Sequence, residues 1–172
     1  MRFLVHKRRG FSALEIVIVL VILSIFSSFA ILSYSSYKKQ ARVKHAAQAV
    51  NSTLTTARTL AINQNADFQV QIDISGRHFW IDQLDSRGRI VKPKVTGSNW
   101  LPEGSLFTDV TMGGVTYNSG RVAIVFDADG SAEYATIHLI GENMDASQPS
   151  NYFSIRIYPS TGLTHIYKNQ RK

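Results

Sequence analysis

A single carboxylate, Glu15, stands near the start of a long apolar run, and no other residue of the sequence has so clear a chemical meaning. The run extends from Phe11 to Leu32, and its remaining polar residues are all serines. An ionisable side chain beside such a segment costs free energy when it leaves water, unless it meets a partner of opposite charge. Glu15 is therefore a functional candidate whose partner has to be named.

The apolar run has the length and composition of a membrane-spanning helix. A hydrocarbon core of about 30 Å requires about 20 apolar residues, and a single span in lipid must be helical to satisfy its own backbone. Basic residues precede the run, namely Arg2, Lys7, Arg8 and Arg9. The positive-inside rule then predicts a cytoplasmic N-terminus and an extracytoplasmic body. A cleaved secretory signal is disfavoured, because its apolar region is usually shorter and contains no glutamate.

Positive charge is unevenly distributed along the chain. The formal net charge is +7, yet the stretch from Ala46 to Tyr167 contains more acidic than basic residues. A cluster follows the apolar run and comprises Lys38, Lys39, Arg42 and Lys44. It has two interpretations, a collar that contacts lipid phosphates or a surface that pairs with acidic neighbours in a filament. The basic C-terminal residues, with Arg156, support nucleic-acid contact only as a minor hypothesis.

Catalytic and metal-binding motifs are missing from the sequence. Asp127-Ala128-Asp129-Gly130 with Glu133 has too few oxygen ligands at the spacing of an EF-hand, and a turn between strands explains it. The histidines show no recurrent ligand spacing, and no nucleophile or phosphate-binding signature occurs. With no cysteine, disulfides and thiolate metal sites are excluded. The sequence predicts no catalytic residue, no metal and no cofactor.

Apolar periodicity predicts that the helix continues beyond the apolar run. Small and aliphatic residues recur at spacings of three and four: Val43, Ala46, Ala47, Val50, Leu54, Ala57 and Ala61. Such a stripe marks one face of an amphipathic helix. We expect one helix of about 50 residues that ends at Asn63–Asn65 and packs its second half on a sheet.

After residue 66 the periodicity changes to two, which indicates β-strands. We expect three hairpins, formed by residues 68–74 with 78–81, 122–126 with 134–140, and 152–158 with 163–167. Between Val91 and Asn118 we expect loops and short strands. A helix followed by antiparallel strands is an α+β arrangement.

The segment Gly10-Phe11-Ser12-Ala13-Leu14-Glu15 resembles the processing site of type IV prepilins and type II secretion pseudopilins. The resemblance implies cleavage between Gly10 and Phe11 by a prepilin peptidase, with N-methylation of Phe11. It also implies that Glu15 pairs with the terminal amine of a neighbouring subunit. The implied fold is pilin-like, a long N-terminal helix packed on antiparallel sheets. The expected divisions are a leader at 1–10, a transmembrane assembly helix at 11–32, its amphipathic continuation at 33–65 and a β domain at 66–172.

Motifs farther along the chain are similar to those of H-type minor pseudopilins and FimT/FimU-type minor pilins. They are Ala57-Arg58-Thr59-Leu60-Ala61-Ile62, the turn at Phe126–Gly130 and the closing Tyr158-Pro159-Ser160-Thr161-Gly162. The resemblance implies a minor pseudopilin of the type II secretion pseudopilus, anchored by one span in the inner membrane with a periplasmic body. The implied partners are other pseudopilins or pilins, the prepilin peptidase, the inner-membrane assembly platform and, before assembly, membrane lipid.

Two alternatives remain open at the level of the sequence. A minor type IV pilin, acting in pilus assembly, twitching or DNA uptake, has the same N-terminal features. An anchored extracytoplasmic binding domain that never polymerises belongs to a different class, and it predicts an intact leader and tolerance of changes at Glu15.

Overall fold

A computed structural model describes residues 12–168, except for the side chains of residues 28–36. Its first element is the helix α1, Ala13–Gln64, and the chain divides into two compact units between Lys38 and Lys39. Within the described residues, no helix combines the length and the apolar character that a membrane crossing demands. The span predicted for residues 11–32 includes Phe11 and side chains at 28–32 that lie outside this description.

The end of α1 agrees with the sequence prediction. Asn65 adopts a left-handed backbone conformation, with φ of 47°, and the Ala66 N–H donates to the Ala61 carbonyl at 3.2 Å. Asparagine tolerates this conformation better than most residues, and the bond satisfies one of the last helical carbonyls. The helix therefore ends where Asn63–Asn65 indicated.

Sheet A contains five strands. They are β1 (Phe68–Asp73), β2 (His78–Leu84), β3 (Ile90–Lys92), β4 (Ser98–Trp100) and β7 (Arg121–Phe126). The order is β3-β2-β1-β7, with β4 also paired to β2, and every pairing is antiparallel. The predicted first hairpin is confirmed as β1 with β2.

Sheet B is also antiparallel and has five strands. They are β5 (Ser105–Met112), β6 (Val115–Tyr117), β8 (Ala135–Gly141), β9 (Tyr152–Ile157) and β10 (Thr164–Lys168). Their order is β10-β9-β8-β5-β6, and a short 3-10 helix, Pro149–Asn151, precedes β9. The predicted closing hairpin is confirmed as β9 with β10.

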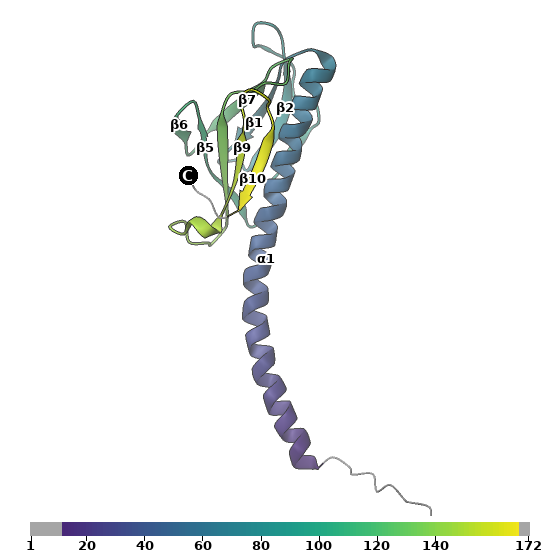
Figure 1. Ribbon diagram of the computed structural model, residues 1–172, viewed down its shortest axis with the longest axis vertical. Helices are drawn as coiled ribbons and strands as arrows, with labels where there is room; N and C mark the ends of the chain where they lie inside the picture. The colour runs from purple at the N-terminus through teal and green to yellow at the C-terminus, as the bar shows by residue number, and fades with distance from the viewer. Residues whose placement is uncertain (1–11, 169–172) are drawn as a thin grey trace, which may run out of the picture. The chain divides into compact units, whose positions relative to one another are not determined.

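The core of the second unit lies between the later part of α1 and the two sheets (Figure 1). Every residue of the predicted apolar stripe has a fully buried side chain: Val43, Ala46, Ala47, Val50, Leu54, Ala57 and Ala61. Sheet A contributes the alternate residues Phe68, Val70 and Ile72, while sheet B contributes Ile137 and Leu139. Small helical residues allow the backbone of α1 to approach strands that carry large side chains.

The hairpin predicted for 122–126 with 134–140 is wrong. Strand β7 pairs with β1 in sheet A, whereas β8 pairs on both edges in sheet B, with β5 and β9. An isolated bridge joins Phe126 to Ala132, which precedes β8. The turn at Asp127–Gly130 therefore carries the chain from one sheet to the other. Strand β5, which lies in a region expected to hold loops and short strands, occupies the place beside β8.

Candidate functional site

Glu15 lies in the first turn of α1, where the positive end of the helix dipole favours a carboxylate. Its side chain is exposed, and so are the large apolar side chains around it. The exposed fractions are 71% for Leu14, 52% for Ile16 and 60% for Leu20. A row of exposed apolar side chains marks a surface that is covered by lipid or by a partner in use. Gly10 and Phe11, the predicted processing residues, lie outside the described residues.

The basic residues that follow do not form one patch. Lys38, Lys39, Arg42 and Lys44 are all exposed on α1. At 3.6 residues per turn, Lys39 and Arg42 project from neighbouring sides of the helix, and Lys44 projects from nearly the opposite side to Arg42. Val43, between them, is fully buried. Arg42 reaches over Gly104, where a side chain would meet its guanidinium.

The three motifs that carry the resemblance in the body meet at one place. Arg58 on α1 donates from Nε to the Thr161 carbonyl at 2.6 Å. The turns at 127–130 and 158–162 touch directly, since a Cβ added to Gly162 would lie 2.2 Å from the Gly130 carbonyl oxygen. The two glycines adopt positive φ values of 85° and 57°. The motifs are therefore a structural junction between the helix and the two sheets.

Asp127 and Asp129 accept hydrogen bonds from Ser131 at the end of their own turn. The Ser131 hydroxyl donates to Asp129 Oδ1 at 2.7 Å, and the Ser131 N–H donates to the same oxygen at 2.8 Å. These hydrogen bonds lower the pKa of Asp129. Among the described residues, no three acidic or histidine side chains come together as a metal site requires.

A buried His–Asp pair lies in sheet B and was not singled out in the sequence. His138 Nδ1 is 2.6 Å from Asp109 Oδ1, and Ser154 is the cross-strand partner of His138. All three residues are less than 5% exposed, and His138 Nε2 has no hydrogen-bond partner among the described atoms. A catalytic serine would need both access to substrate and a hydrogen bond to that nitrogen. The arrangement therefore does not form a Ser-His-Asp nucleophile.

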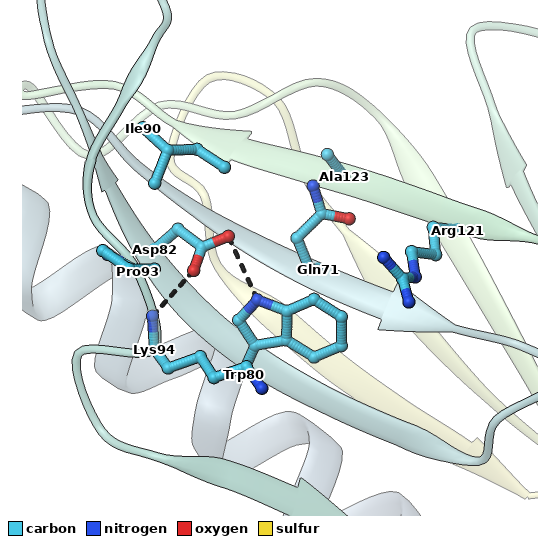
Figure 2. A pocket seen from close by; sticks show the side chains of 8 residues that line it. All are labelled: Gln71, Trp80, Asp82, Ile90, Pro93, Lys94, Arg121 and Ala123. Atoms are coloured by element: carbon cyan, nitrogen blue, oxygen red, sulfur yellow. Dashed lines mark hydrogen bonds between the residues drawn. The ribbon is translucent and has the colours of Figure 1, made fainter.

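The outer face of sheet A holds the most organised polar cluster, which the sequence analysis missed (Figure 2). Asp82 is 1% exposed and accepts from three donors on its two oxygens. The donors are Trp80 Nε1 at 3.1 Å, Gln69 Nε2 at 3.2 Å and the Lys94 backbone N–H at 2.8 Å. We call Gln71, Trp80, Asp82, Lys94 and Arg121 the Trp80 cluster. His78, Trp80 and Asp82 alternate with the apolar Phe79 and Ile81 along β2, but this spacing does not indicate which residues of other segments join them.

Two cations flank the indole of the Trp80 cluster. Lys94 Nζ lies 5.5 Å and Arg121 Cζ 5.7 Å from the Trp80 ring centroid, within the range of a cation–π interaction. Arg121 also pairs through Nε with Asp73 Oδ2 at 3.0 Å. The Gly76 N–H and Arg121 lower the pKa of Asp73 by hydrogen bonding. A hollow of about 380 Å³ opens between the cations, with Ile90 and Pro93 at its border.

The fold is that of the type II secretion minor pseudopilins and the type IV minor pilins. Two solved structures of the minor pseudopilin EpsH from the type II secretion system of Vibrio cholerae match with TM-scores of 0.60 and 0.57. Their identities are 18% and 19%, and each match covers 76% of this chain and 99% of EpsH. The type IV minor pilin FimU of Pseudomonas aeruginosa matches with a TM-score of 0.54 and 14% identity, over 78% of this chain and 95% of FimU.

The family described as type II transport protein GspH matches residues 46–161. That match covers more than half of the sequence, and the chain belongs to the GspH family. Comparison with curated protein sequences finds no match. The matched region contains the Trp80 cluster and, from the junction, Arg58, Gly130 and Thr161, and it ends one residue before Gly162.

Proposed function

We propose that the protein is a minor pseudopilin, a structural subunit of a type II secretion pseudopilus. The observation that carries the proposal is the exposed apolar start of α1 with Glu15 in its first turn, joined to a GspH-family body. The subunit contributes contacts rather than catalysis. Its role follows from what covers that helix before and after assembly.

Assembly exchanges one apolar environment for another. Before assembly, the segment 11–32 lies in the inner membrane with the body in the periplasm. During assembly, the same side chains pack against the helices of other pseudopilins. Because lipid is already apolar, packing and polar pairs must supply the free energy of association. The pairing of Glu15 with the terminal amine of a neighbour is strong because both charges lie in a medium of low dielectric constant.

Processing creates the partner of Glu15. A prepilin peptidase cleaves between Gly10 and Phe11, and methylation follows at the new amino group of Phe11. Cleavage removes the basic leader and leaves an amine on Phe11, so that Glu15 becomes the fifth residue of the processed chain. Two subunits offset along a filament can then pair amine with carboxylate. The inner-membrane assembly platform and the other pseudopilins are the remaining partners.

A minor type IV pilin is the second candidate, and the shared fold of FimU is compatible with it. The two candidates share processing, anchoring and helix-mediated assembly, and they differ in the filament that receives the subunit. The alternative from another class is an anchored domain that never polymerises. In such a protein Glu15 would form no pair with a neighbouring subunit, and its replacement would be tolerated.

The intact mass of the protein, extracted from membranes of the cells that make it, tests the proposal. We expect a chain that begins at Phe11 and is heavier by one methyl group. An uncleaved chain would identify a plain anchor, and a chain beginning near Ile31 would identify a secreted domain. Either of these two results would overturn the proposed function.

A further inference from the structure

The outer face of sheet A presents a continuous line of side chains that nothing described so far uses. Trp100 stacks on His78 with ring centroids 4.8 Å apart, and His78 stacks on Trp80 at 4.9 Å. Trp80 in turn borders the hollow that Ile90 and Pro93 close on the other side. The line follows β2 for about six residues, or roughly 20 Å at 3.3 Å per residue. An extended segment of similar length matches this surface.

The surface is organised before any ligand arrives. Asp82 fixes the indole of Trp80 and the backbone of Lys94 by hydrogen bonds to both of its oxygens. Lys94 adopts a positive φ of 50°, which is uncommon for a residue with a side chain, and its carbonyl accepts from the Gly97 N–H at 2.9 Å. A strained residue held by its surroundings often marks a binding position.

The charges on this face favour an acidic ligand. The carboxylates are inward, since Asp82 is 1% exposed and the Asp73 side chain is 14% exposed, and each accepts hydrogen bonds from the body. The cations point outward, because Lys94 is exposed and the Arg121 side chain is 66% exposed. Within the described residues the ammonium of Lys94 forms no ion pair. A carboxylate approaching from solvent meets both cations first.

Apolar exposure at both ends of the line distinguishes a protein ligand from other anions. Trp100 is 68% and Ile90 50% exposed, and exposed aromatic and aliphatic side chains beside arginine are typical of protein interfaces. Nucleic acid would need successive open rings for base stacking, but Trp80 is only 7% exposed. The acidic excess of the body also opposes a phosphate backbone.

We propose that the outer face of sheet A, from Trp100 to Ile90, binds an extended acidic segment of a partner protein and seats one of its carboxylates between Lys94 and Arg121. This surface is separate from the apolar start of α1. The inference therefore goes beyond helix-mediated assembly, and the two can fail independently.

Site-specific photo-crosslinking in the cells that make the full-length protein tests the inference. A photoreactive residue replaces Ile90, and the same residue at Val115 serves as the matched control, since Val115 is 53% exposed in sheet B. We expect a crosslink from position 90 to a protein segment that contains Asp or Glu, identified by mass spectrometry. A product that contains nucleic acid or glycan, or crosslinking no stronger than at position 115, would overturn the inference.

Charge reversal completes the test. Lys94→Glu should weaken the crosslink about tenfold, the effect of losing about 1.4 kcal/mol of binding free energy. We expect the fold of this variant to be retained, because the contact with Asp82 uses the backbone N–H of residue 94. Arg87→Glu, an equal charge change at an exposed site outside the hollow, should leave the crosslink intact. Replacing the crosslinked acidic residue by Lys should restore contact with Lys94→Glu.

An unchanged crosslink in Lys94→Glu, or a failure of the reversed pair to restore it, would refute the role of this cation. The mature N-terminus and filament incorporation are measured in the same cells. Normal processing and incorporation without a crosslink from position 90 would contradict only the proposed binding at the outer face of sheet A. Absence of processing would contradict only the proposed function.

Discussion

Helix α1 carries apolar side chains in two parts, a first part near its start and a second part from Val43 to Ala61. These side chains are exposed in the first part and buried in the second. In the first part, large residues such as Leu20 and Phe26 are 60% and 68% exposed. In the second part, the apolar stripe consists mostly of alanine and valine, and every member is fully buried against the sheets. Small residues suit contact with the chain's own strands, whereas large exposed residues require a covering supplied from outside. One helix thus carries both a buried stripe and a set of exposed apolar side chains, and the latter is the surface to which we assign assembly.

The largest expected effect is on assembly, and it concerns only the first part of α1. Glu15→Ala should abolish incorporation into filaments, because the terminal amine of the neighbour then loses its partner in a medium of low dielectric constant. Processing and membrane insertion should remain intact. Incorporation is measured by recovery of the subunit in sheared filaments.

Ser27→Ala is the matched control for Glu15→Ala, since the Ser27 hydroxyl donates to the Leu23 carbonyl of its own helix, at 2.8 Å. We expect normal incorporation of this variant. Equal recovery of Glu15→Ala and the unchanged protein in filaments would remove the assembly role of Glu15.

The second effect sharpens the contrast between the two parts with one substitution made in each. Leu54→Ala should lower the free energy of unfolding of the body by about 2–5 kcal/mol, since Leu54 is fully buried. Leu20→Ala should leave that free energy unchanged. Urea denaturation of the full-length protein in detergent, followed by circular dichroism, measures both. Equal losses in the two variants would contradict the division of α1.

A smaller effect is expected where the second part of α1 reaches the closing turn. Arg58→Ala removes the hydrogen bond from Nε to the Thr161 carbonyl and should cost about 1 kcal/mol of unfolding free energy. Thr59→Ala is the control, because its hydroxyl donates to the Thr55 carbonyl within the helix. If the two variants unfold at the same urea concentration, the contact does not secure the turn to the helix.

The smallest effect lies in sheet A and depends on pH. The pKa of Asp73 is lowered in the folded protein, so its stabilising contribution is present above the unfolded pKa and disappears as the pH falls through the folded pKa. Asp73→Asn should therefore destabilise the body at neutral pH and make little difference in strong acid. Thermal unfolding from pH 7 down to pH 2 compares the two proteins. A constant difference across this range would contradict the assignment.

The sequence predicted the elements whose pattern is local. Burial of the stripe from Val43 to Ala61 follows from helical spacing alone, and the end of α1 follows from Asn65. Strand β5 was missed because a bulge between Phe107 and Asp109 interrupts its alternation and places a buried aspartate among apolar residues. The omission of β5 also explains the wrong hairpin, since β8 pairs with β5 rather than with β7.

The Trp80 cluster could not be predicted, because strand register creates it. Gln71 lies opposite Trp80, and Asp73 lies opposite both His78 and Arg121. The guanidinium of Arg121 therefore reaches an indole some 40 residues earlier in the chain. Lys94 arrives through a loop whose conformation depends on a hydrogen bond to Asp82. The spacing of residue types along the sequence indicates neither the approach of Arg121 to Trp80 nor that of Lys94 to Asp82.

The two tryptophans of the chain have very different environments, with Trp80 7% and Trp100 68% exposed. The protein consequently contains a pair of intrinsic optical probes. A soluble quencher such as acrylamide should extinguish the emission of Trp100 first and reach Trp80 only when the sheet opens. A molecule that covers the outer face of sheet A should protect Trp100 from the quencher, and a carboxylate seated between Lys94 and Arg121 should also change the emission of Trp80.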